Sequence, residues 1–282
     1  MIMLLKERAR VLVQCTKCKK IKSIRKDYFK ALVHDYWCNH CSPRWKPETF
    51  SDRIRLSSAH RKYCLDENFF SEINNEEKAY WLGFLAADGA ITENRVRLRL
   101  ARKDEEHLRE FKNAVKWSGK DYIPKNNNGI EVGFRSLKMV VDLEKYFVTP
   151  RKTFTIKFPY LPKEMERHFV RGVFDADGCI SKCKRIKIGQ MGQKYVSFGG
   201  DFCIEGNKQF ISVLQSRLTK IGLPYNSINY SGKSISRVRY GGINQLVKIY
   251  DYLYKDTKLF LKRKKELFED IIKNYRCEKV SA

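Results

Sequence analysis

Two short stretches decide the fold: YWLGFLAADG at Tyr80–Gly89 and FVRGVFDADG at Phe169–Gly178. The second follows the first at an offset of 89 residues (169 − 80), and four places carry the same residue in both. The matching pairs are Gly83 and Gly172, Ala87 and Ala176, Asp88 and Asp177, and Gly89 and Gly178. A repeat at a fixed offset predicts two copies of one structural unit.

The small residues of each stretch predict two closely packed helices. Glycine inside a helix costs about 1 kcal/mol relative to alanine, so its presence at the same place twice needs a reason. Gly83 and Ala87 are four residues apart and share one helix face, as Gly172 and Ala176 do. We therefore expect the two helices to touch along these faces, at the interface of two half-domains. The run Asn74–Lys78 predicts the start of the first helix, because a capping asparagine and acids favour an N-terminal turn.

The last two residues of each stretch predict a cation site. Gly89 and Gly178 are expected to take the left-handed backbone conformation that ends many helices. Asp88 and Asp177 then lie at helix C-termini, where the helix dipole disfavours an anion, and side by side they would also repel each other. Carboxylates and exposed carbonyls are ligands for hard divalent cations, so the pair predicts a Mg²⁺ site. The alternative is two ordinary Asp-Gly helix ends.

The segments after each stretch predict strands with one cationic face. Val96, Leu98 and Leu100 alternate with arginines, which is the period-two pattern of a half-buried strand, and similar patterns recur later in both halves. The outward cations are Arg95, Arg97, Arg99, Arg135, Arg185, Lys187, Arg237 and Arg239. Such a sheet suits the major groove of DNA, although solvated strands of a basic protein are the alternative. Helical patterns follow at 104–117 and 207–223.

The charge balance points to a polyanionic partner. The 282 residues include 57 Lys and Arg against 32 Asp and Glu, a formal net charge of +25. Neutralised phosphates release counterions, so we expect a nucleic acid. An acidic membrane surface is the weaker alternative, because the basic residues are spread along the chain and not gathered on one amphipathic helix. The N-terminus does not look like a secretory signal, and no run of eighteen apolar residues exists to cross a membrane.

Four of the nine cysteines have the spacing of a zinc site. Cys15 and Cys18 form one CxxC pair, and Cys38 and Cys41 form a second. Two such pairs supply a tetrahedral set for one structural Zn²⁺, which would provide much of the folding free energy of so small a module. His34 or His40 replacing a cysteine, and accidental spacing, are the alternatives. The other cysteines are expected to be reduced thiols: Cys64, Cys179, Cys183, Cys203 and Cys277.

The paired stretches resemble the motifs of LAGLIDADG homing endonucleases of the single-chain, two-motif kind, over roughly residues 65–275. The CxxC pairs resemble small zinc fingers appended to mobile-element nucleases. The resemblance implies an α+β fold, in which two pseudo-symmetric αββαββα halves form a DNA-binding saddle. We expect a zinc module at 1–45, a basic linker at 46–75, and the two halves at 76–160 and 161–282.

The resemblance also implies roles for single residues. Asp88 and Asp177 would bind two or three Mg²⁺ ions, helped by the carbonyls of Gly89 and Gly178, and a monomer would hydrolyse both strands of a specific DNA site. A lysine is expected near each scissile phosphate. The candidates are Lys152 in the first half and Lys262 in the second, with Lys264 as competitor to Lys262. Arg102 and Lys103 are expected to help order solvent.

Some features depart from the motif or leave the function open. Asp175 stands where the first stretch has Ala86, and Arg171 is unusual in an apolar helix, so we expect it to point outward. Intein ends are missing, which predicts a free-standing protein encoded in an intron or between genes. We expect it in the cytoplasm of a bacterial or phage-infected cell, or else in an organelle. A maturase acting on its own intron RNA, a DNA-binding regulator of the same fold, and a zinc-finger regulator are the alternatives.

Overall fold

The structure of the chain is a computed structural model. It describes residues 10–15, 18–25, 50–59, 61–124, 128–152, 155–188, 194–226, 229–231 and 235–279. The chain divides into two compact units, residues 1–53 and residues 54–282. Within these described ranges, no helix is both long and apolar enough to span a bilayer.

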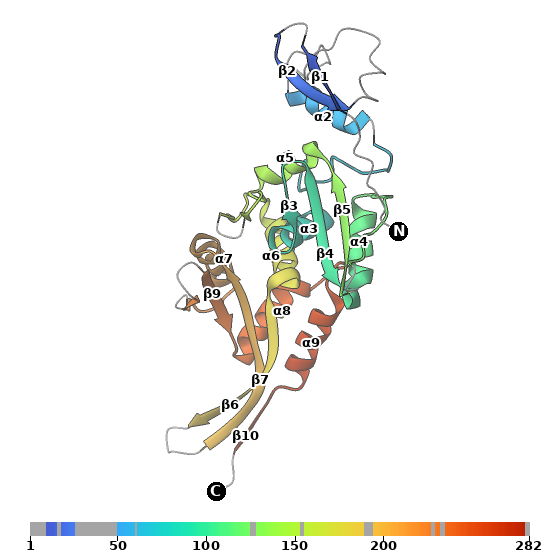
Figure 1. Cartoon of the computed structure of the whole chain (residues 1–282). Helices are drawn as coiled ribbons and strands as arrows, with labels where there is room; N and C mark the ends of the chain where they lie inside the picture. The colour runs from blue at the N-terminus through green and yellow to red at the C-terminus, as the bar shows by residue number, and fades with distance from the viewer. Residues whose placement is uncertain are drawn as a thin grey trace, which may run out of the picture. The chain divides into compact units, whose positions relative to one another are not determined.

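Two helices at the centre of the larger unit carry the repeated stretches (Figure 1). Helix α3 spans Glu76–Ala87 and helix α6 spans Lys163–Asp177, so both predicted helices are confirmed. The start of α3 is also confirmed, because the Asn75 side chain accepts a hydrogen bond of 2.9 Å from the Lys78 amide.

The two helices cross at their glycines. A Cβ atom on Gly83 would overlap the carbonyl oxygen of Phe169, and one on Gly172 would overlap that of Tyr80. The reciprocal overlap shows that each glycine lets one backbone reach the other, as the sequence predicts. Side chains larger than hydrogen would force the two halves apart.

The glycines that follow each acid do not take the expected left-handed conformation. Gly178 has φ −69° and ψ 159°, and Gly89 also lacks a positive φ. Glycine is needed at these positions because a side chain would not fit. A Cβ on Gly89 would lie 2.5 Å from the Leu85 carbonyl oxygen, and one on Gly178 would lie 2.7 Å from that of Phe174. The chain therefore leaves each helix by a path that has no room for a side chain.

The first half is a short antiparallel sheet with helices around it. Its elements are β3 (Ala90–Ile91), β4 (Arg95–Ala101), a 3₁₀ turn η1 (Arg102–Asp104), α4 (Glu105–Ala114), β5 (Gly129–Arg135) and α5 (Leu137–Lys145). The strand order is β3-β4-β5, and a bridge between Tyr122 and Glu131 adds a trace of a fourth strand. In β4 the alternate residues Val96, Leu98 and Leu100 are buried, as predicted.

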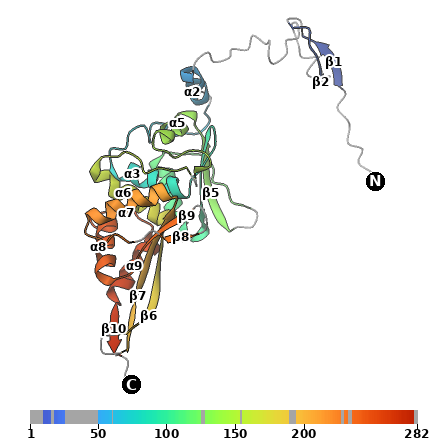
Figure 2. The ribbon, with the colours of Figure 1, turned by 90° about the vertical axis from the view of Figure 1, so that its left-hand side faces the viewer.

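The second half begins in the same order, with longer first and second strands, and adds a further helix and strand at its end. Its elements are β6 (Cys179–Ile188), β7 (Lys194–Gly206), α7 (Lys208–Lys220), β8 (Asn229–Ser231), β9 (Ile235–Tyr240), α8 (Ile243–Tyr254), α9 (Lys262–Lys273) and β10 (Arg276–Lys279). Strand β7 pairs with β6 along one edge and with both β9 and β10 along the other. In Figure 1 the α3–α6 pair lies between the sheets of the two halves, and Figure 2 shows the same elements turned by 90°.

The smaller unit contains a β-hairpin of β1 (Arg10–Gln14) and β2 (Ile21–Arg25). The turn between them holds Cys15 and Cys18, and the Cys15 carbonyl accepts a hydrogen bond of 2.9 Å from the Lys19 amide. Helix α2 (Phe50–Ala59) begins in this unit. The other predicted zinc ligands, including the alternatives His34 and His40, lie outside the described residues.

Candidate metal centre and nucleic-acid interface

The repeated acids lie at the ends of the two crossed helices. Asp88 caps α3, with its amide donating to the Phe84 carbonyl at 2.9 Å, and Asp177 is the last residue of α6. The pKa of Asp88 is raised from its usual value, mainly by burial and next by the charge of Asp177, while the positive charges of Lys264 and Lys152 act in the other direction. The two carboxylates are therefore close enough for the charge of Asp177 to act on Asp88.

A lysine lies at each helix end. The Lys152 ammonium donates a hydrogen bond to the Gly89 carbonyl. Lys264 donates to the carbonyls of Gly178 at 2.6 Å and Phe174 at 2.7 Å, with a longer contact to Ala176 at 3.2 Å. These contacts repeat one arrangement in both halves, because a lysine from a later segment reaches the backbone just past each acid.

Burial lowers the pKa of both lysines. The pKa of Lys264 is lowered to about 8, chiefly by burial, and the charge of Asp175 is the largest effect that opposes this. The pKa of Lys152 is also lowered by burial, while Asp88 and Asp177 oppose the shift. Each lysine is thus held in a low-dielectric environment beside acids.

The expected pairing of Lys262 with the second acid is not what the geometry shows. Lys262 is exposed and lines a surface depression together with Lys103 and Glu266, whereas Lys264 is buried against Gly178. The reason is helical phase: Lys264, Phe268 and Ile271 share the buried face of α9, and Lys262 lies off that face.

The carboxylate and carbonyl oxygens at the two helix ends fit a hard cation that keeps water molecules as its other ligands. Among the described residues, no three His, Cys, Asp or Glu side chains form a metal-ligand group, so any metal here relies on the carboxylates of Asp88 and Asp177 plus backbone oxygens. Burial is the main cause of the raised pKa of Asp88 and the charge of Asp177 is the next, and the neighbouring cations do not cancel the shift. Mg²⁺ prefers this kind of site, with a few carboxylates and retained waters.

The described residues of the predicted zinc module fit a thiolate ligand pair. Cys15 is buried and Cys18 half-buried, both in the tight hairpin turn before β2. A CxxC turn of this kind presents two sulfurs to one metal ion. The remaining predicted ligands, Cys38 and Cys41, fall outside the described residues, so the full set stays a prediction.

The basic strand faces carry acids as well as arginines. Glu131 lies across from Arg99 in the β4–β5 register and contacts Arg95 at 3.7 Å. In the second half, Asp201 pairs with Arg185 and lies 3.4 Å from Arg239, and Glu205 accepts a hydrogen bond of 2.6 Å from Arg237. These strand positions are thus not purely cationic, and several of the predicted DNA-binding side chains already have an anionic partner.

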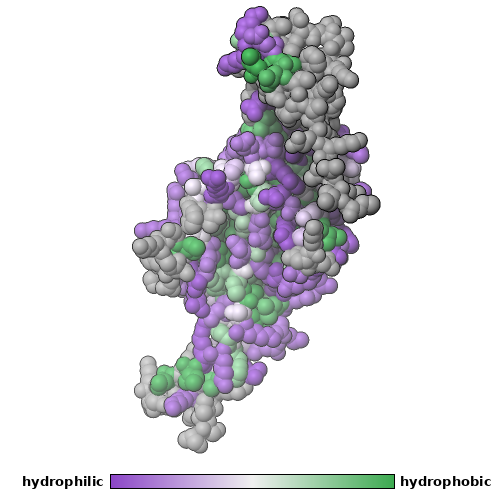
Figure 3. Space-filling model, in the orientation of Figure 1, coloured by the Kyte–Doolittle hydropathy of each residue, from purple (hydrophilic) through white to green (hydrophobic). Residues whose placement is uncertain are grey.

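The surface over these sheets is mainly hydrophilic (Figure 3). Lys187 lies near the end of the β6–β7 ribbon, directly across from Tyr195. Hydrophobic surface appears at the same end, where Ile186 and Ile188 are more than two-thirds exposed. Arg102, one of the expected solvent-ordering residues, forms an ion pair of 3.0 Å with Glu105.

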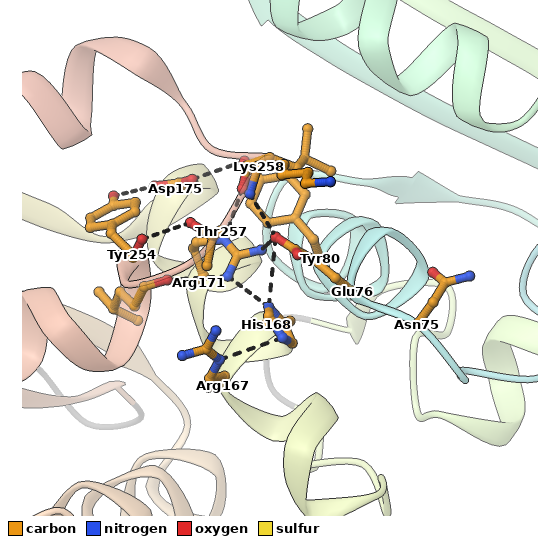
Figure 4. Close-up of polar contacts among 12 residues, drawn as sticks. Asn75, Glu76, Tyr80, Arg167, His168, Arg171, Asp175, Tyr254, Thr257 and Lys258 are labelled. Atoms are coloured by element: carbon orange, nitrogen blue, oxygen red, sulfur yellow. Dashed lines mark hydrogen bonds and ion pairs between the residues drawn. The ribbon is translucent and has the colours of Figure 1, made fainter.

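A buried polar network that the sequence does not predict lies between the two motif helices (Figure 4). Arg171, expected to point outward, is fully buried and donates to Glu76 of α3 at 2.7 Å. Asp175 is also fully buried and accepts from the Tyr80 hydroxyl at 2.9 Å. In the sequence these two residues stand out only as charges four residues apart in a largely apolar stretch, and their partners lie far away along the chain.

The fold agrees with solved structures of DNA-bound proteins. The chain is similar to the I-LtrWI LAGLIDADG homing endonuclease bound to target DNA, with a TM-score of 0.50 and 11% identity over 73% of this chain and 90% of that one. It is also similar to LAGLIDADG meganuclease I-AabMI bound to uncleaved DNA (TM-score 0.48, 11% identity, 71% and 91% covered) and to the I-SmaMI LAGLIDADG homing endonuclease bound to cleaved DNA (0.48, 13%, 72% and 89%). No family model matches the chain, and no curated protein matches it. At these identities the likeness shows the fold, which is that of the LAGLIDADG endonucleases.

Proposed function

We propose that the protein is a LAGLIDADG homing endonuclease that cuts both strands of a specific double-stranded DNA site in a Mg²⁺-dependent hydrolysis. The observation that carries this proposal is the paired arrangement at the helix ends. Asp88 and Asp177 come from two different halves, interact electrostatically, and each has a lysine at the backbone beside it. A protein that only bound DNA, without cutting it, would gain stability by losing two neighbouring acids at helix C-termini.

The residues of the chain divide the work at each centre. Asp88 and Asp177 would hold Mg²⁺ with help from the carbonyls of Gly89 and Gly178, and a bound Mg²⁺ supplies water activation and charge stabilisation. Lys152 and Lys264, whose ammonium groups lie at these carbonyls, would supply positive charge beside the phosphate, since a cation is favoured where negative charge develops. Helix crossing at the glycines fixes the separation of the two acids and thereby the spacing of the two cuts.

The sheets would supply the DNA contacts. The predicted phosphate and base contacts are Arg95, Arg97, Arg99, Arg135, Arg185, Lys187, Arg237 and Arg239. The strand pairings join them in two groups, one on β4 and β5 and the other on β6 and β9. A DNA duplex running across both sheets would pass over the α3–α6 pair. We infer that the zinc module at the N-terminus, held by Cys15, Cys18, Cys38 and Cys41, lengthens the DNA site bound by a monomer.

Selection from a randomised duplex library tests the proposal. The protein is incubated with the library and Mg²⁺, and the cut ends are sequenced to define the site. Asp88→Asn and Asp177→Asn should each reduce double-strand cleavage by about a thousandfold or more, because each removes a metal-binding carboxylate. Asp251→Asn, which changes an exposed acid on α8, is the matched control and should cut normally.

The DNA-binding step is measured in the same variants. Binding of the selected duplex without divalent metal should be unchanged or tighter in the Asn variants, because a negative charge has been removed near phosphates. Full double-strand cleavage by either variant would disprove the role of the acids. Recovery of bound but uncut DNA from wild type would favour the regulator or maturase alternative.

A further inference from the structure

Four buried or half-buried side chains link the motif helices in two successive turns; we call them the interhelical clamp. They are Glu76 and Tyr80 on α3, and Arg171 and Asp175 on α6 (Figure 4). Each pair is four residues apart and so lies on one helix face. The first rung is the Arg171–Glu76 ion pair at 2.7 Å, and the second is the Tyr80 hydroxyl donating to Asp175 at 2.9 Å.

Both rungs also bind the connection between α8 and α9. The Arg171 guanidinium donates to the carbonyls of Leu259 at 2.9 Å and Leu253 at 3.1 Å. Glu76 accepts from the Lys258 amide at 3.2 Å. These contacts attach the last turn of α8 and the later part of the connection to the first rung.

Asp175 binds the two ends of the same connection. It accepts hydrogen bonds from the Tyr254 hydroxyl at 2.6 Å and from the Leu261 amide at 2.8 Å. A fully buried carboxylate with three donors is strongly directional, because leaving any of its oxygens unpaired in a dry interior is costly. The Leu261 backbone is thereby fixed relative to α6.

The clamped residue is the cap of the helix that carries Lys264. Leu261 is the N-cap of α9, and its carbonyl accepts from the Lys264 amide at 3.0 Å. Arg263 of the same turn donates to Asp104 of the first half at 2.8 Å. The clamp therefore holds the first turn of α9 against both halves, and this turn directs the Lys264 ammonium onto the end of α6 beside Asp177.

The first half cannot repeat this arrangement. At the offset of 89 residues, Leu82 stands where Arg171 stands and Ala86 where Asp175 stands. Neither side chain can form a hydrogen bond, so α3 has no means of binding the segment around Lys152 in the same way. That segment instead contains Arg151 with a φ of +57°, a conformation that L-residues rarely adopt.

We propose that Arg171 and Asp175 are positioning residues that hold Lys264 in place before DNA binds, so that the strand served by Lys264 is cut faster than the strand served by Lys152. The inference rests on the proposed endonuclease function and adds an inequality between its two centres. Preorganised groups need no rearrangement at the moment of reaction, and misplacement of such a group by an ångström lowers the rate sharply.

The experiment follows each strand of the selected duplex separately. Single-turnover reactions with enzyme in excess remove any effect of affinity, and a different fluorophore on each strand reports its cleavage rate. Lys264→Met and Lys152→Met first identify which strand depends on which lysine. Wild type should then cut the Lys264 strand first, and a nicked duplex should appear before the double-strand break.

Asp175→Asn should slow the Lys264 strand by on the order of tenfold to a hundredfold, with less than about a twofold change on the other strand. Tyr254→Phe removes the hydroxyl that donates to Asp175 and keeps the aromatic ring, so it should slow the same strand by a smaller factor. The control is Asp142→Asn, which removes a buried first-half acid that binds Ser71, Lys138 and Lys145. It should affect both strands alike.

Amide hydrogen exchange of the free protein tests the clamp without any reaction. Residues 255–261 should exchange faster in Asp175→Asn and at the wild-type rate in Asp142→Asn. If Asp175→Asn does not fold, Tyr254→Phe carries both measurements. Equal cutting of the two strands by wild type, or equal slowing of both by Asp175→Asn or Tyr254→Phe, would overturn the positioning role. Wild type that cuts neither strand would overturn the endonuclease proposal itself.

Discussion

The two motif helices are alike in their backbone and unlike in what they bury. Both cross at a glycine and end with an acid followed by glycine. On α3 the interior positions 79, 82 and 86 are Ala, Leu and Ala, while α6 has His168, Arg171 and Asp175 at the matching places. All three α6 residues are at most 7% exposed. The repeated residues therefore set how the halves meet, and the residues that differ set how firmly one connection is held.

The largest expected effect is on stability, at the crossing glycines that both helices have. Gly83→Ala and Gly172→Ala should each lower the free energy of unfolding by about 3 kcal/mol or prevent folding, because the new Cβ overlaps a backbone carbonyl of the partner helix. The roughly 1 kcal/mol that alanine gains in helix propensity is too small to offset this. Urea unfolding measures both variants.

We expect similar losses of unfolding free energy in the Gly83 and Gly172 variants, because the two overlaps are reciprocal. Gly242→Ala is the control: the nearest atom to its Cβ lies at 3.5 Å, and a change below about 1 kcal/mol is expected at this helix cap. A mild effect at one crossing glycine and a severe one at the other would show that the crossing is not symmetric in solution.

Much of the fold could be predicted because its signals are local. The repeated glycines, the capping Asn75 and the alternation in β4 each act within one or two turns or strands, and the structure confirms them. Placing Lys264 needed only the helical phase of α9, since Phe268 lies four residues further on the same face. The helix-end glycines show the limit of a general rule, because here space and not a left-handed φ requires glycine.

The burial of Arg171 could not be predicted because its partners are remote in sequence. Glu76 lies 95 residues before it, and Leu253 and Leu259 lie 82 and 88 residues after it. Only the packed helix pair brings these acceptors together. An arginine without them would be driven to the surface by its desolvation cost, which is the outcome expected from the local sequence.

A smaller effect is expected on the pH dependence of stability, through His168, a buried residue of α6 that has no counterpart on α3. Burial and next the Arg171 charge lower the pKa of His168 from 6.5 to about 4; Arg167 adds to this and Glu76 opposes it. Between pH 6.5 and 4 the unfolded chain takes up a proton and the native protein does not. The free energy of unfolding should therefore fall by up to about 3 kcal/mol over this window and be unaffected by this group above it.

His168→Asn is the matched variant, because its side-chain oxygen can accept from Arg171 at the place of Nδ1 without titrating. Urea unfolding at pH 4.5 and pH 7.5 should show a smaller loss in this variant than in wild type. The first half offers no equivalent group, since Ala79 occupies the matching place. An unchanged loss in His168→Asn would mean that acid weakens the protein through other residues.

The smallest expected effects compare the two sheets that we propose to face DNA. Arg99 on the first sheet is exposed, whereas Arg237 on the second is tied to Glu205. Arg99→Gln should weaken binding of a random duplex by roughly threefold and lower the salt slope by about one, as for the loss of a single phosphate contact. Glu205→Gln should instead strengthen binding by roughly twofold, because it frees Arg237 and removes a charge that repels phosphates. Fluorescence anisotropy over a salt series, without divalent metal, measures both; weaker binding by Glu205→Gln would mean that the ion pair orients Arg237 for DNA, and the second sheet would then be the better prepared of the two.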